Sequence, residues 1–143
     1  MVDVFKSYFS RFIIITCVVL LSACSNLDSV SQAPVDAGIS REFQGDHEFV
    51  KAAVLASMQS LNIHIKDTRQ SEQGYIILFT KGITAMSWGE VGRVVVVDEG
   101  GDKNVVRVHS SGRVKAQLFG VKEEQFAVSI FNDVSNILSR NPK

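Results

Sequence analysis

Short stretches of alternating apolar and polar residues occupy the middle of this chain and predict a β-sheet. Residues 39–43 (ISREF) and 62–67 (NIHIKD) alternate in this way, which is typical of strands with one buried face. The run from Tyr75 to Thr80 is almost entirely apolar. We therefore expect a central strand there, covered by helix on one face and by chain or ligand on the other.

A further pair of strands is predicted around a glycine-rich turn. Residues 90–98 include four consecutive valines, and β-branched residues favour extended backbone. Residues 99–102 read EGGD, and the two glycines allow the positive φ angles of a hairpin turn. Residues 104–110 then return as the partner strand, and residues 114–119 leave room for one more short strand.

Two segments repeat with a helical period. Asp46 suits the N-terminal cap of the first helix, which we expect to run to about Ser60. The second helix is expected over about residues 122–139. Its apolar stripe consists of Phe126, Ile130, Val134 and Ile137.

These elements follow the order β-α-β-β-β-β-(β)-α and predict a single domain of the α+β class. An antiparallel sheet of four to six strands with two helices packed on one face would bury every apolar stripe. The topology resembles that of helix-grip and related α+β folds. The segment MSWGE at residues 86–90, with the valine-rich hairpin that follows, is also similar to stretches of small uncharacterised bacterial envelope proteins. That resemblance implies no activity.

The N-terminus is built like a secretory signal. Lys6 and Arg11 precede an apolar run from Phe12 to Leu21, which is shorter than the roughly 20 residues that span a bilayer. The segment Leu21-Ser22-Ala23-Cys24 at its end resembles the lipobox of bacterial lipoproteins. In that family the cysteine thiol receives a diacylglyceryl group, the chain is cut directly before the cysteine, and the new amine is commonly acylated.

The resemblance assigns residues 1–23 to a signal peptide that is cleaved between Ala23 and Cys24, and it makes Cys24 the lipidated first residue of the mature chain. The alternatives are an ordinary cleaved signal peptide and a membrane anchor that is never cut. Ser25 follows the cysteine, at a position where lipoproteins retained in the inner membrane commonly carry aspartate. The resemblance therefore implies an outer-membrane lipoprotein that faces the periplasm, in preference to an inner-membrane one.

Residues 24–38 comprise the lipidated cysteine and a tether. Residues 25–38 (SNLDSVSQAPVDAG) are mostly small or polar and show no regular period, so we expect a flexible linker. Fully extended, this linker would reach about 50 Å, and its average span would be about 20 Å. Residues 39–140 form the globular domain that it carries.

Charge and motifs argue against several functions. The chain has 15 basic and 15 acidic residues, and without a basic excess we expect no nucleic-acid partner. His47, His64 and His109 lack the spacing of metal ligands, so we expect surface histidines, no metal and no cofactor. His109 and Ser110 are neighbours on a strand, which points them to opposite faces and argues against a catalytic pair. With no nucleophile elbow and no phosphate or dinucleotide loop, the sequence favours a protein that is not an enzyme.

Trp88 is the single tryptophan. With Met86 and Phe119 it is our candidate for a binding surface, because tryptophan offers a large contact area and a polar N–H. The alternative, which we favour, is that Trp88 closes the core at the start of a strand. We expect a non-catalytic interaction module, anchored in the lipid bilayer through Cys24, that presents a surface to another envelope protein. The second hypothesis is a binder of a small apolar ligand or lipid in a groove between sheet and helix.

Overall fold

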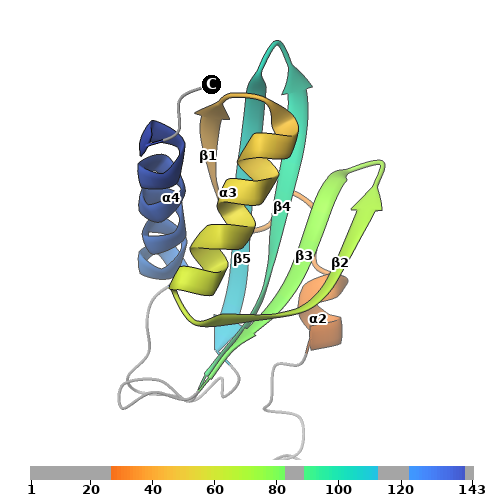
Figure 1. Cartoon of the computed structure of the whole chain (residues 1–143). Helices are drawn as coiled ribbons and strands as arrows, with labels where there is room; N and C mark the ends of the chain where they lie inside the picture. Colours follow the sequence, from red (N-terminus) through yellow and green to blue (C-terminus); the bar gives the residue numbers. More distant parts are fainter. Residues whose placement is uncertain (1–26, 83–88, 113–122, 141–143) are drawn as a thin grey trace, which may run out of the picture.

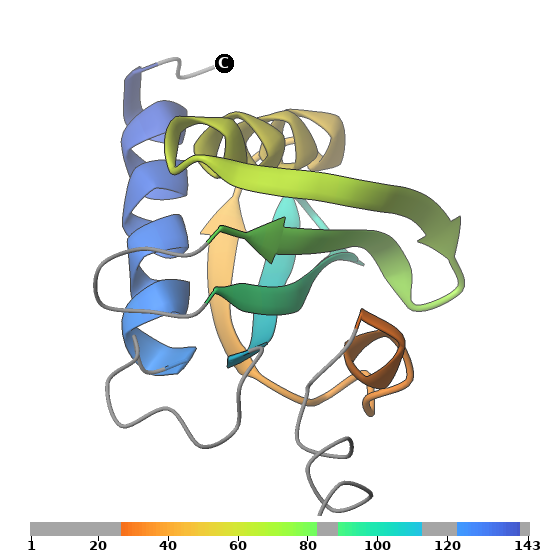
Figure 2. The same ribbon diagram turned by 90° about the horizontal axis from the view of Figure 1, so that it is seen from below.

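The computed structural model describes residues 27–82, 89–112 and 123–140. They form a five-stranded antiparallel sheet in the order β1-β5-β4-β3-β2, with two long helices on one face and a short helix on the other (Figures 1 and 2). The strands are β1 (Ile39–Gln44), β2 (Ile63–Ser71), β3 (Gly74–Lys81), β4 (Glu90–Gly100) and β5 (Lys103–Gly112). The helices are α2 (Leu27–Ser31), α3 (His47–Ser60) and α4 (Glu123–Arg140). The predicted α+β class and the two helices on one face are confirmed.

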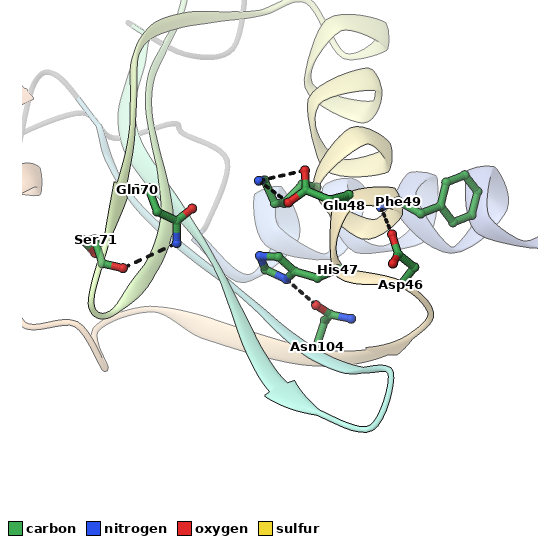
Figure 3. A network of polar contacts seen from close by, with 8 residues as sticks. Asp46, His47, Glu48, Phe49, Gln70, Ser71 and Asn104 are labelled. Carbon is green, nitrogen blue, oxygen red and sulfur yellow. Dashed lines mark hydrogen bonds and ion pairs between the residues drawn. The ribbon is translucent and has the colours of Figure 1, made fainter.

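Helix α3 begins at the predicted cap. The Asp46 carboxylate accepts a hydrogen bond from the Phe49 N–H at 3.1 Å (Figure 3), which satisfies one of the open amides of the first helical turn. At the other end Asn62 adopts a φ of 54° and leads the chain directly into β2. The helix turns its apolar side to the sheet and buries Val50, Ala53, Val54 and Met58 there.

The face covered by α3 and α4, here called the helix face, carries the main core. Strand side chains that point to it are Ile77, Phe79, Val94, Val96, Val106 and Val108. The Phe79 ring stacks on Phe126 of α4, with ring centroids 5.4 Å apart. Phe79 also lies over Gly92 on the neighbouring strand, and a Cβ atom at that glycine would collide with the ring. A residue without a side chain is therefore what allows the aromatic pair to form.

The β4–β5 hairpin has the predicted turn. Gly100 and Gly101 both adopt positive φ, 82° and 61°, which residues with a side chain adopt at a steric cost. Strand β2 is longer than predicted, because residues 68–71 continue to pair with β3 after a bulge. The additional strand predicted over residues 114–119 lies outside the described residues.

The flexible linker predicted for residues 25–38 is wrong for residues 27–38, which we call the strap. The strap lies across the second face of the sheet, here called the strap face, opposite α3 and α4 (Figure 2). Val30 is 2% exposed, and Leu27 packs against a cluster formed by Ile76, Leu78 and Val95. These two apolar residues are too few to reveal a helix in a polar segment, and the sheet supplies the rest of the apolar contact. The second face of the predicted central strand β3 is thus covered by chain.

Candidate functional site

The site residues predicted from the sequence lie outside the described part of the chain. They are Ala23, Cys24, Met86, Trp88 and Phe119. The described ends of the segments that carry the last three are neighbours in the sheet, because Lys81 pairs with Glu90 and Glu90 pairs with Gly112. Both segments therefore leave the sheet at the same end.

The principal buried charge on the strap face is Arg93 of β4. This residue is 3% exposed, and its guanidinium donates hydrogen bonds to backbone carbonyl oxygens of the strap. Nη1 lies 2.9 Å from the carbonyl oxygen of Ala33 and 3.5 Å from that of Ser31, and Nη2 lies 2.6 Å from that of Pro34. The buried Nε has no hydrogen-bond partner within the described chain. A planar guanidinium suits this position because its fork of donors reaches several acceptors at once.

Arginines from two other strands hold the strap beside Arg93. Arg107 of β5 donates to the carbonyl oxygen of Val35 at 3.1 Å, and Arg69 of β2 donates to Oγ of Ser31 at 3.1 Å. We call Arg69, Arg93 and Arg107 the arginine latch. Within residues 27–82, 89–112 and 123–140, none of the three forms an ion pair with a carboxylate.

The electrostatics of the latch follow from this arrangement. Burial, and then the positive charges of Arg69 and Arg107, lower the pKa of Arg93 from its ordinary value. The buried guanidinium is therefore stabilised by the dipoles of strap carbonyls, which take the place of water and of a counter-ion. If the strap were lifted, these donors would lose their acceptors together.

Sequence reasoning missed the latch, although one signal for it is present. Arg93 is the only charged residue in the apolar run from Val91 to Val97. A charge in a strand that is buried on both faces needs partners. The partners here are backbone carbonyls, however, and these leave no mark on the side-chain pattern of the strap. The sequence could therefore have indicated that Arg93 has a partner, but not which segment supplies it.

His47 belongs to a polar network at the start of α3 (Figure 3). Its Nδ1 lies 2.7 Å from Oδ1 of Asn104, and Nδ2 of Asn104 donates to the carbonyl oxygen of Gly45 at 2.8 Å. Because that second bond fixes the orientation of the amide, Oδ1 must accept and Nδ1 of His47 must carry the proton. Asn104 is 1% exposed. The network joins the start of α3 to β5 and has a structural role.

His109 is tied to the start of α4. Its Nδ1 lies 2.8 Å from Oε1 of Glu123, and the same oxygen accepts a hydrogen bond from the Ser110 N–H at 2.9 Å. The first residue of β1, Ile39, pairs with Val108, so Glu123 contacts the edge of β5 just beyond the start of β1. Ser110 points away from His109 toward the helix face, where it is 6% exposed. As predicted, the two neighbours do not form a Ser–His pair.

His64 is exposed on β2, as predicted for the polar side of that strand. Among the residues that the structure describes, no group of three or more His, Cys, Asp or Glu side chains could hold a metal ion. None of the described helices is both long and apolar enough to span a bilayer.

The arrangement on the strap face is suited to binding oxygen acceptors through directional, charge-assisted hydrogen bonds. In this structure the chain itself provides those acceptors. In comparison with known proteins, no protein-family model and no curated protein matches the chain. What the chain does is therefore inferred from its own residues and their geometry.

Proposed function

We propose that this chain is a lipoprotein of the bacterial outer membrane, held in the bilayer by acylated Cys24, and that its domain is a non-catalytic interaction module facing the periplasm. The observation that carries the proposal is the order of residues at the end of the apolar run, where Leu21, Ser22 and Ala23 directly precede the cysteine. Ser25 at the next position favours the outer membrane over the inner one. Each buried methylene of an acyl chain contributes about 0.8 kcal/mol, so two or three chains hold a protein firmly.

The position of the folded chain supports an anchor at Cys24. Packed residues are described from Leu27 onward, so cleavage before Cys24 would leave the whole described domain attached to the lipid. A non-catalytic role is supported by two half-buried histidines whose contacts hold elements of the fold together. His47 joins α3 to β5, and His109 joins β5 to α4.

The alternative function, an apolar ligand in a groove between sheet and helix, has no comparable support. The described side chains between the sheet and the long helices pack against one another and are almost fully buried. Examples are Val50, Met58, Ile77, Ile130 and Val134, each 0% exposed. We therefore propose only the interaction module.

The anchor is tested by metabolic labelling of cells with a palmitate analogue, followed by separation of the inner and outer membranes on a density gradient. We expect the wild-type chain to carry the label in the outer-membrane fraction, and Cys24→Ser to carry none. Cys17→Ser is the matched control, since it removes the other cysteine of the chain from the middle of the apolar run and should label normally. A wild-type chain that takes up no label and stays in the soluble fraction would overturn the proposal.

The interaction role is tested separately on intact membranes. Chemical crosslinking of the acylated protein, followed by purification, is expected to recover the same envelope protein in repeated experiments. Variants of this chain with an altered strap or an altered surface loop should no longer recover it. Recovery of no reproducible partner would count against an interaction module while leaving the anchor intact.

A further inference from the structure

The strap changes the length of chain that is free between the lipid and the domain. The proposed anchor is Cys24, and α2 begins at Leu27 and packs on the sheet. We infer that the docked strap shortens the free connection and so keeps the domain against the lipid surface, with only residues 24–26 between the acyl chains and the packed fold. This inference rests on the proposed function, because it needs an acylated Cys24.

The difference in reach is large. Three residues span at most about 10 Å, whereas a free chain from Cys24 to Gly38 would span up to about 50 Å. A domain joined to the lipid by three free residues (the short leash) stays at the level of the headgroups. A domain joined by the whole free segment from Cys24 to Gly38 (the long leash) samples a wide range of distances from the bilayer. The docked strap would therefore confine the domain to the membrane surface.

Two kinds of contact hold the strap on the sheet, and hydrogen bonds within the strap add to them. Val30, on the buried side of α2, is 2% exposed, and the arginine latch binds oxygen atoms of residues 31–35. The strap is also folded locally, since the N–H groups of Gln32, Ala33 and Ala37 donate to carbonyl oxygens within it. These three amides report directly on whether the strap is docked.

The orientation of the domain follows from the same contacts. Helix α2 lies on the strap face, where Leu27 packs against Ile76, Leu78 and Val95 (Figure 2). On a short leash the strap face is therefore turned toward the bilayer, and the helix face points away from it. The described surface that another envelope component could reach most easily is the outer side of α3 and α4.

The experiment measures the distance of the domain from the bilayer. The acylated full chain is reconstituted in vesicles of phosphatidylethanolamine and phosphatidylglycerol that contain a trace of headgroup-labelled acceptor lipid. After processing and acylation no free cysteine is expected, so a donor dye can be placed uniquely at Glu72→Cys in the exposed β2–β3 turn. An insertion of about a dozen Gly and Ser residues between Ser25 and Asn26 lengthens the leash without touching the strap and sets the long-leash signal.

We expect energy transfer to be high for the native strap and to fall to a lower value with the insertion. Val30→Asp places a carboxylate on the buried side of α2 and should release the strap, so that transfer falls and the amides of Gln32, Ala33 and Ala37 lose their protection from hydrogen exchange. Gln32→Asp is the matched control, because it introduces the same residue at an exposed position of the strap. It should behave like the native chain.

The native chain and the insertion variant are enough to decide the inference, because neither of them carries a destabilising substitution. The test therefore holds even if Val30→Asp fails to fold. Acylated protein with the same transfer in both would overturn the short leash and leave the proposed function standing. Protein without an acyl group would overturn the proposed function itself.

Discussion

The two faces of the sheet are held in different ways. On the helix face, aliphatic and aromatic side chains of α3 and α4 interlock with five strands, and the Phe79–Phe126 stack lies at one end of this core. On the strap face, the apolar cluster is limited to Ile76, Leu78 and Val95 with a few partly buried neighbours. Hydrogen bonds from the arginine latch supply much of the remaining contact. The helix face is therefore stabilised mainly by buried apolar area, and the strap face depends more on directional hydrogen bonds.

This difference decides how each face can open. Apolar burial contributes about 25 cal/mol per Å² and declines gradually as surfaces separate. A hydrogen bond from a charged donor contributes about 1.5–3 kcal/mol, and it is lost within a fraction of an ångström. The latch binds one short segment, so its bonds break together when that segment moves. We therefore expect the strap to detach as a unit while the helix face stays closed.

The largest expected effect separates the two faces with one residue type. Ile77 and Ile76 are consecutive on β3, with Ile77 0% exposed on the helix face and Ile76 6% exposed on the strap face. We expect Ile77→Ala to lower the free energy of unfolding by about 4 kcal/mol and Ile76→Ala by about 2 kcal/mol. The second cavity costs less because the short α2 can shift toward it.

Urea unfolding of the two variants, followed by circular dichroism, measures both values. The pair controls for residue type, strand and sequence position, so the remaining difference is the face. Equal losses, or a larger loss for Ile76→Ala, would show that the strap face is as well packed as the helix face.

The second prediction concerns the latch. Arg93→Lys keeps the charge but loses the fork that reaches three carbonyl oxygens, and one ammonium on a flexible stem cannot replace it. We expect the free energy of strap opening to fall by about 2 kcal/mol, which is roughly a thirtyfold faster amide exchange at Gln32, Ala33 and Ala37. The free energy of global unfolding should change less than this.

Arg107→Lys is the matched control, because Arg107 donates to a single carbonyl oxygen of the strap, that of Val35, and a lysine can still bond one acceptor. Its effect on strap exchange should be about threefold or less. If Arg93→Lys speeds amide exchange in the centre of β4 as much as in the strap, the expectation that the strap opens on its own is wrong. In that case the sheet and the strap would open as one unit.

The helix face could be predicted almost completely from the sequence. Its signals are local: a period of two in the strands, a period near 3.6 in the helices, an aspartate at the start of α3 and adjacent glycines in the β4–β5 turn. Each of these reflects the conformation of its own segment. An antiparallel sheet with both helices on one face buries the apolar sides of all these elements, and so the fold class followed.

The strap face could not be predicted, because sequence signals of this kind are local and the order of the strap depends on distant contacts. The strap is ordered by contacts with strands that lie more than 30 residues later, such as those of Ser31 with Arg69 and Ala33 with Arg93. Its own composition is that of a linker, since small polar residues dominate and Pro34 interrupts it. Carbonyl oxygens are present in every residue, so a segment that binds an arginine through its backbone resembles one that binds nothing.

The smallest expected effect lies at the end of the sheet and belongs to neither face. Hydrogen bonds from Lys103 to Glu99 and Glu42, at 2.8 and 3.1 Å, raise the pKa of Lys103 above its ordinary value of 10.5. A raised pKa in the folded state means that these bonds stabilise the fold fully below pH 10.5, and that the contribution is lost as the pH rises through the folded value.

Lys103→Met should therefore flatten the alkaline decline of stability slightly, whereas Lys66→Met, at an exposed lysine of β2, should leave it unchanged. Thermal unfolding between neutral pH and the alkaline limit measures both slopes, and a flattening equal in the two variants would assign the decline to net charge instead of to this ion pair. Because the pair is exposed and screened by salt, the change should be small beside the effects at Ile77 and Arg93, which places surface charge last among the forces that hold this domain.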